Sequence, residues 1–205
     1  MTLVRAVSIL GIGFVLAASS HAGIIFSVTD DTLTVADPSQ LGRLSRDGIP
    51  SDWSGPKAFP GVINLTTSYH YRSYLIPIVN TPFIQITVDD PNAAIFSSAY
   101  MDSYNPADLA SNYLGDGGFS GNFFPGSPLF FQVVVPSGHN LVLVINDPAA
   151  GGAGLGIPYS LVVEGFVDTN FNEPPAVPEP ASMFLSAIGL SVGAAAWRWR
   201  SKRVV

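Results

Sequence analysis

The chain of 205 residues contains no cysteine. Disulfide bonds, thiol catalysis and zinc sites with cysteine ligands are therefore excluded, and a folded domain must be stabilised by its core alone. Histidine is scarce, with three residues, and glutamate occurs only as Glu164, Glu173 and Glu179. Because metal centres and glycosidase sites draw heavily on these residue types, we expect no catalytic constellation and predict that the protein is not an enzyme.

Basic residues are rare in the middle of the chain. All fifteen acidic residues lie between Asp30 and Glu179, and this span contains only four bases, which gives it a formal charge of −11. The four bases are Arg43, Arg46, Lys57 and Arg72. A body this acidic repels the phosphate backbone, which excludes nucleic acid as a partner.

Long amphipathic helices are also missing from the middle of the chain. The sequence has 20 glycines and 17 prolines, and its hydrophobic fraction of 47% is sufficient for a buried core. Apolar runs of strand length, bounded by turn residues, occur at 24–28, 32–35, 62–65, 71–79, 83–88, 94–100, 129–135, 141–146 and 159–166. Within one run, Ile84, Ile86 and Val88 fall on the same face of a strand. The pattern predicts an all-β fold, a single antiparallel β-sandwich that is jelly-roll-like.

Residues 40–60 interrupt this pattern, because they hold three of the four bases, several glycines and prolines, and little apolar material. We interpret them as a long loop or linker that Trp53 and Phe59 pin to the core. The expected organisation is N-terminal strands and loop at 23–60, a β-sandwich domain at 61–168 and a Pro-rich linker at 169–180.

The N-terminal residues 1–22 have the form of a secretory signal peptide. Arg5 supplies a positive start, and the uncharged run 6–18 is too short to cross a membrane. Small residues then precede a cleavage site between Ala22 and Gly23. We predict export by the general secretion machinery and removal of this segment by signal peptidase.

The C-terminal residues 181–205 combine an apolar segment with a basic tail. Residues 181–197 carry no charge and would rise about 25 Å as a transmembrane helix. The tail contains the bases Arg198, Arg200, Lys202 and Arg203. Because such residues stay on the cytoplasmic side, we expect an inner-membrane-anchored precursor with its C-terminus in the cytoplasm and its body outside.

Pro178, Glu179 and Pro180 stand directly before this apolar segment. Proline stops any upstream helix and leaves an extended peptide at the membrane surface, which suits a processing enzyme. The whole ending, Pro-Glu-Pro followed by an apolar helix and an Arg-rich tail, resembles the PEP-CTERM sorting signal of Gram-negative bacteria. The resemblance implies that an exosortase, a membrane cysteine transpeptidase, recognises these three residues, and that the protein accompanies exopolysaccharide or biofilm production. A plain single-span anchor is the alternative.

A second resemblance covers about residues 69–165. Tyr-Leu-Gly-Asp-Gly-Gly at 113–118, Val-Pro-Ser-Gly at 135–138 and Tyr-Ser-Leu-Val-Val at 159–163 are similar, in order and spacing, to two turns and the last strand of bacterial pre-peptidase C-terminal β-sandwich modules. Those modules are non-catalytic accessories, so the resemblance implies a non-enzymatic body.

The acidic segment 102–116 is the one candidate ligand site. Its Asp102, Asp108 and Asp116 offer the hard oxygen atoms that calcium prefers, although their spacing is not that of an EF-hand. The alternative is turn capping, in which the same side chains accept hydrogen bonds from nearby backbone. Apart from calcium, no cofactor is expected.

Together these patterns predict an exported structural or adhesion protein of the cell surface or extracellular matrix, linked to exopolysaccharide or biofilm. The alternatives are an extracellular calcium- or glycan-binding module and a secreted hydrolase that uses aspartates. The expected partners are the exosortase, the signal peptidase, the secretion machinery, the inner membrane as a transient anchor, and an extracellular polysaccharide.

Overall fold

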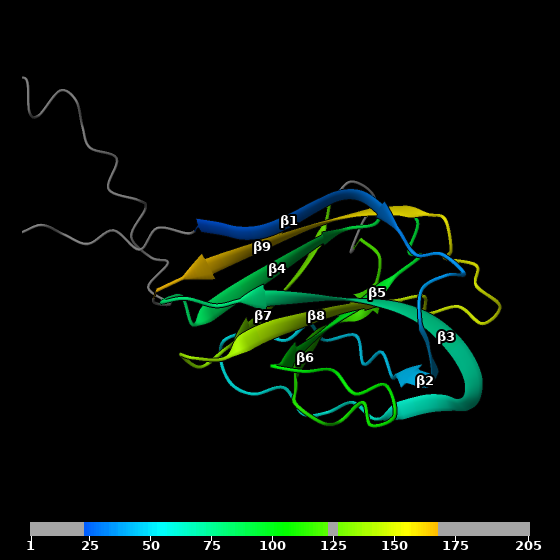
Figure 1. Ribbon diagram of the computed structural model, residues 1–205, viewed down its shortest axis with the longest axis horizontal. Coiled ribbons are helices and arrows are strands. Elements are labelled where there is room, and N and C mark those ends of the chain that lie inside the picture. Colours follow the sequence, from blue (N-terminus) through cyan, green and yellow to red (C-terminus); the bar gives the residue numbers. More distant parts are fainter. Residues whose placement is uncertain (1–22, 123–126, 168–205) are drawn as a thin grey trace, which may run out of the picture. The chain divides into compact units, whose positions relative to one another are not determined.

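The computed structural model describes residues 23–122 and 127–167, in which nine strands and no helix are found (Figure 1). All strand pairs are antiparallel and belong to two sheets. The four-stranded sheet contains, in spatial order, β1 (Gly23–Thr32), β9 (Pro158–Phe166), β4 (Phe83–Asp89) and β7 (Leu129–Val134). The five-stranded sheet contains β2 (Ser39–Leu44), β3 (Val62–Pro77), β8 (Asn140–Asn146), β5 (Phe96–Met101) and β6 (Tyr113–Ser120).

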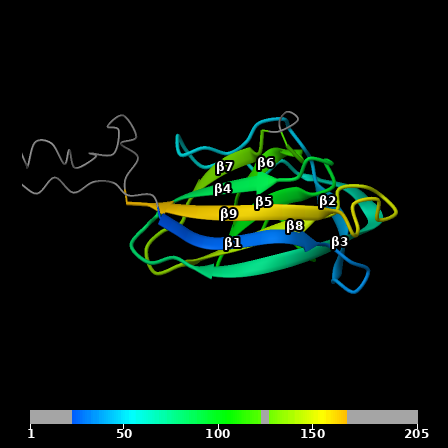
Figure 2. The ribbon, with the colours of Figure 1, turned by 90° about the horizontal axis from the view of Figure 1, so that it is seen from above.

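The two sheets form the predicted β-sandwich. Seen from above in Figure 2, β1, β9, β4 and β7 lie side by side. Strands distant in the sequence complete each sheet, as β9 does between β1 and β4, and this is the order of a jelly roll with β2 added at an edge. The described residues contain no helix that could cross a membrane. The predicted signal peptide, Pro-rich linker and C-terminal helix lie outside them.

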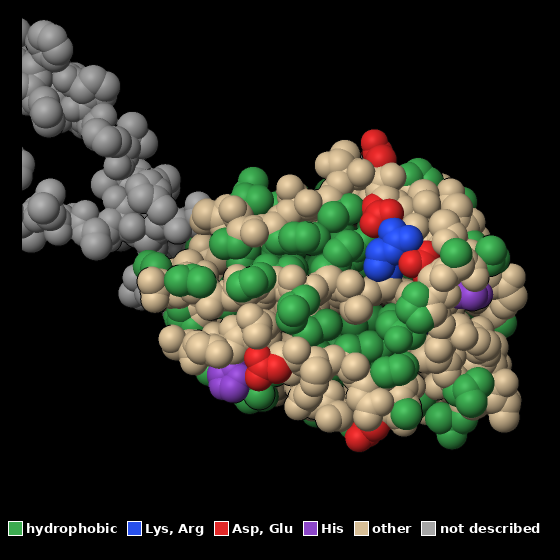
Figure 3. Space-filling model, in the orientation of Figure 1, with side chains coloured by type: hydrophobic (Ala, Val, Ile, Leu, Met, Phe, Trp, Pro, Cys, Tyr) green, Lys and Arg blue, Asp and Glu red, His purple; other side chains and the backbone are tan. Residues whose placement is uncertain are grey.

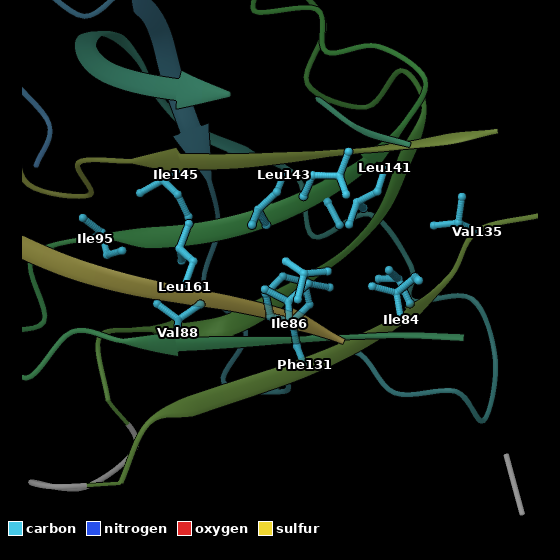
Figure 4. Close-up of a cluster of buried hydrophobic side chains, with 14 of the residues drawn as sticks. Ile84, Ile86, Val88, Ile95, Phe131, Val135, Leu141, Leu143, Ile145 and Leu161 are labelled. Atoms are coloured by element: carbon cyan, nitrogen blue, oxygen red, sulfur yellow. The ribbon is translucent and has the colours of Figure 1, made fainter. Parts of the chain in front are cut away.

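The main core lies between the sheets, where alternate residues of each strand meet (Figure 4). Ile84, Ile86 and Val88 of β4 are all buried, so the predicted shared face is confirmed. Opposite them, β8 contributes Leu141 and Leu143, which are completely buried. Each such side chain stabilises the fold by roughly 1.5–3 kcal/mol relative to an exposed one, and in a chain without disulfides this burial must hold the sheets together.

The outer face of the five-stranded sheet is also covered. Tyr100, Val142 and Val144 are buried there beneath a group of partly buried tyrosines. Those tyrosines are Tyr71, Tyr104 and Tyr113. Because β8 is enclosed on both faces, its sequence is a continuous apolar run rather than an alternating one.

Two segments differ from the sequence interpretation. Residues 40–44, expected to begin the long loop or linker, belong to β2 and pair with β3. The register of this pair shifts around Gly42, which has a φ of 74°, and this irregularity breaks the alternation that would reveal a strand. Residues 113–118, expected as a turn, belong to β6. The sequence pattern also divided β3 into two strands and assigned 32–35 a strand of its own, whereas β1 ends at Thr32.

Residues 23–60 are part of the same structural unit as the rest of the body. Strand β1 is the outer strand of one sheet and β2 is the outer strand of the other. Gly23 pairs with Gly165, close to the last residue of β9, Phe166. Both ends of the folded body therefore lie at the same end of the sandwich (Figure 1).

Candidate functional site

One side of the sandwich is closed by residues 45–57, which we call the docked loop. The Ser51 amide donates to the Asp116 carbonyl of β6 at 3.0 Å, and the Gln132 amide of β7 donates to the Ser51 carbonyl at 2.8 Å. Gly48 adds a hydrogen bond to the Gly118 carbonyl at 3.1 Å. Since β6 and β7 are the outer strands of different sheets, Ser51 links the two sheets at their edges. Of the two alternatives for this segment, a long loop or a linker, residues 45–57 form the long loop.

A buried ion pair fastens the docked loop to β6. Lys57 Nζ lies 2.6 Å from Asp116 Oδ1 and 2.9 Å from Asp47 Oδ1. The Asp116 side chain is 0% exposed and also accepts hydrogen bonds from the Tyr113 hydroxyl and the Gly118 amide. Burial, the charge of Asp116 and the hydrogen bond between the two side chains raise the pKa of Tyr113 above its usual range. All of these contacts are internal, so Asp116 is a structural anchor.

The glycines around Asp116 leave room for the docked loop. A Cβ on Gly115 would lie 2.4 Å from Ser51 Oγ, and one on Gly118 would lie 2.5 Å from the Ile49 carbonyl carbon. Gly118 also has a φ of 70°, which side chains other than glycine rarely adopt. The Gly-Asp-Gly-Gly pattern thus marks a strand against which another backbone packs closely.

Trp53 and Phe59 pin the docked loop and the residues after it, as predicted. The Trp53 indole donates to the backbone carbonyls of Ile84 at 3.2 Å and Val133 at 3.1 Å. Its ring packs edge-on against Phe166, with centroids 5.3 Å apart. Phe59 packs in the same manner on Tyr113 at 5.3 Å.

Two adjoining hollows lie between the docked loop and β7, and we call them together the β7 groove. Their volumes are about 340 and 430 Å³, within the usual range for ligand sites. Asp52 and Gln132 line both hollows. The first is further lined by Tyr113, Leu114 and Val134, and the second by Pro50, Ser51 and Phe130.

Gln132 is held in place by a row of polar side chains across the outer face of the four-stranded sheet. Its Nε2 donates to Gln85 Oε1 at 2.9 Å, and Gln85 Nε2 donates to Glu164 Oε2 at 3.3 Å. The three residues are direct neighbours on β7, β4 and β9. Among the described residues, Gln132 Oε1 has no hydrogen-bond donor, so this atom remains open to a ligand.

The opposite side of the sandwich is closed by charged side chains. Arg72 of β3 donates to both carboxylate oxygens of Asp37, at 2.9 and 2.8 Å, and to Asp31 at the end of β1. Asp31 also accepts from the Tyr74 hydroxyl at 2.6 Å, and that hydroxyl lies 2.7 Å from the Tyr159 hydroxyl. Figure 3 shows basic and acidic side chains adjoining on this face, among mostly hydrophobic and neutral ones.

Titration in this cluster follows from its contacts. Burial raises the carboxyl pKa values of Asp31 and Asp37, but the hydrogen bonds from Arg72 and its neighbours outweigh it, so both pKa values lie below the usual range. Burial raises the pKa of Tyr159 to about 12. The carboxylates therefore stay ionised and paired near neutral pH.

The three calcium candidates are not brought together. Asp102 Oδ2 lies 2.6 Å from His139 Nδ1 and its Oδ1 accepts from the Asn140 amide. Asp108 accepts from the Ala110 amide within its own turn, and Asp116 is bound to Lys57 in the buried pair described above. Within residues 23–122 and 127–167, no group of three acidic or histidine side chains is arranged so that it could hold a metal ion. Capping and pairing account for all three aspartates.

Sequence reasoning did not single out Lys57 or Gln132. Lys57 could have been noticed, because it is the only lysine between the two ends of an acidic chain. Gln132 carries no comparable signal, since its importance depends on strands β4 and β9 that are distant in the sequence.

The residues of the sorting signal, the basic tail and Ala22 lie outside the described part of the chain. A family model described as the PEP-CTERM protein-sorting motif matches residues 176–203. No curated protein and no solved structure matches the chain. The motif indicates an exosortase-sorted extracellular protein made as a secreted, membrane-transiting precursor. The similarity of the body to pre-peptidase C-terminal modules stays a prediction.

Proposed function

We propose that the mature protein is a non-catalytic structural or adhesion protein of the cell surface or extracellular matrix of a Gram-negative bacterium, associated with exopolysaccharide in a biofilm. The sorting motif at 176–203 is the observation that carries this proposal. Further support comes from the body, where the carboxylates of Asp31, Asp37 and Asp116 are occupied by internal pairing. A hydrolase that uses aspartates would need such groups exposed to its substrate.

In the proposed route, the secretion machinery exports the chain and signal peptidase cleaves between Ala22 and Gly23. The segment 181–197 holds the precursor in the inner membrane, and the basic tail keeps the C-terminus in the cytoplasm. Exosortase then recognises Pro178–Pro180 and separates the body from this segment. Gly23 is the first residue of β1, so the first cleavage leaves the sandwich complete.

Replacement of the motif tests the route. The double substitution Pro178→Ala and Glu179→Ala should leave the precursor in the membrane fraction of the native host, whereas the wild-type body should be recovered at the surface or in the matrix. Pro174→Ala with Pro175→Ala is the matched control, because it alters two nearby prolines and leaves the motif intact. Normal release of the motif variant, or a mature form that retains Val205 by mass spectrometry, would contradict the proposal.

A glycan-binding module is the second candidate, and the β7 groove favours it. Calcium binding has no comparable support, since its three candidate aspartates are used elsewhere. An unchanged unfolding temperature on addition of calcium or a chelator would exclude a calcium site.

A further inference from the structure

The β7 groove combines an apolar surface with fixed polar groups. Phe130, Gln132 and Val134 point to the same side of β7, because side chains alternate along a strand. Phe130 is 55% exposed and Val134 is 42% exposed, although both are large and hydrophobic. Between them, the side-chain amide of Gln132 is oriented by Gln85, and its oxygen has no hydrogen-bond donor within residues 23–122 and 127–167. Preorientation of this kind lowers the entropic cost of binding a ligand.

The backbone of β7 is not open to an added peptide strand at this point. The backbone amide of Gln132 already donates to the Ser51 carbonyl, and the backbone carbonyl of Val133 accepts a hydrogen bond from the Trp53 indole. A peptide that extends a sheet needs such edge groups for its main-chain hydrogen bonds. The occupant must therefore be recognised by side chains rather than by β-strand addition.

Charge restricts the occupant further. The body between residues 23 and 167 has twelve acidic and four basic residues, a formal charge of −8. Within the groove, Asp52 is exposed; its Oδ1 accepts hydrogen bonds from the amide and hydroxyl of Ser54, which leaves Oδ2 for a ligand. The charge of Lys57 is compensated by Asp47 and Asp116. A polyanion would be repelled, while hydroxyl groups could donate to the Asp52 carboxylate and to Gln132.

The two hollows adjoin and share Asp52 and Gln132, so they offer room for one extended ligand. A sugar ring presents an apolar face of C–H groups and a rim of hydroxyls, and it matches an exposed aromatic ring beside a fixed amide and a carboxylate. We propose that the β7 groove binds a neutral, linear polysaccharide, with Phe130 contacting a sugar face and Gln132 and Asp52 accepting hydrogen bonds from hydroxyls. This inference rests on the proposed function and names the ligand class and site for it.

Affinity electrophoresis of the full chain in a mild detergent tests the site. The chain has a formal charge of −6 and migrates to the anode, so binding to a soluble glycan in the gel appears as retardation. The probes are a β-1,3-glucan, a β-1,4-glucan and a dextran as neutral polymers, with alginate as the anionic one. We expect retardation by at least one neutral glucan, and about tenfold weaker association for Phe130→Ala and for Gln132→Ala.

Leu75→Ala is the matched control, because Leu75 is 64% exposed on β3, in the sheet that does not contain β7, and lines neither hollow. It should bind like the wild type, and thermal melts should show that all three variants are folded. Absence of retardation by every neutral glucan, retardation by alginate alone, or unchanged binding by both groove variants would overturn the inference. Such a result would leave the proposed export and processing intact, since release from the membrane in the host is measured separately.

Discussion

Lys57 and Asp116 are buried together, and removing the charge of Lys57 leaves the Asp116 carboxylate without its cation. We predict that Lys57→Met lowers the free energy of unfolding by about 3–5 kcal/mol, the usual cost of breaking a buried pair, as measured by urea denaturation. Adding Asp116→Asn to this variant should recover part of the loss, because the amide carries no charge. Arg46→Met is the control, with an expected change below about 1.5 kcal/mol, because this exposed residue of the same loop makes a single hydrogen bond, to the Ser120 hydroxyl. A Lys57→Met variant as stable as this control would disprove the anchoring role.

Arg72 contributes to the response of the body's stability to acid. It helps to hold the carboxyl pKa values of Asp31 and Asp37 below their usual value of about 4. A depressed carboxyl pKa contributes stability that is complete above the ordinary pKa and is lost as the pH falls through the folded-state value. We therefore expect Arg72→Met to be less stable than wild type by about 1 kcal/mol at pH 7, with the difference shrinking below pH 4. If the difference in free energy of unfolding between wild type and Arg72→Met stayed constant from pH 7 to pH 3, this origin of the acid sensitivity would be contradicted.

At the level of the elements, a glycine of β6 and a glycine of the turn between β7 and β8 have similar backbone angles but should contribute differently to stability. Gly118 and Gly138 both have positive φ, 70° and 87°, but only Gly118 lies against another backbone, that of Ile49. We predict that Gly138→Ala costs about 1–2 kcal/mol, the penalty for the left-handed conformation alone. Gly118→Ala should cost clearly more and should release the docked loop, seen as faster amide exchange at Ser51 and Gln132. Equal costs for the two variants would mean that the loop contact contributes nothing.

The sequence alone predicts those strands that are buried in the same way along their whole length. Strands β4 and β9 alternate because one face is buried, and β8 is continuously apolar because both faces are buried, so all three were found. Strand β6 was missed because its glycines serve the docked loop, a partner about 65 residues away that no local pattern reveals. The groove could not be predicted for a similar reason, because Gln132 is held by Gln85 and Glu164, which belong to strands distant in the sequence. The sorting signal was recognisable because it is contiguous.

For the whole molecule, the positions of the two ends of the folded body lead to a prediction of which end of the sandwich faces away from the membrane in the proposed precursor. Gly23 and Phe166 lie at one end, and the loops that follow β1, β4 and β8 lie at the other. In the proposed precursor both membrane-directed segments continue from the first end. The opposite end, which includes Val35, should then be farthest from the attachment, whereas Val79, between β3 and β4, should be close to it.

This arrangement can be tested with single cysteines, because the native chain has none. Val35 is 79% exposed and Val79 is 72% exposed, so the two positions are closely matched in the folded body. In membrane-held precursor, accumulated through Pro178→Ala and Glu179→Ala, a bulky maleimide should label Val35→Cys several times faster than Val79→Cys, because the membrane obstructs the nearer site. In the released body the two rates should be alike, which controls for intrinsic reactivity. Equal labelling in the precursor would show that the body is not held by the end at which both termini emerge.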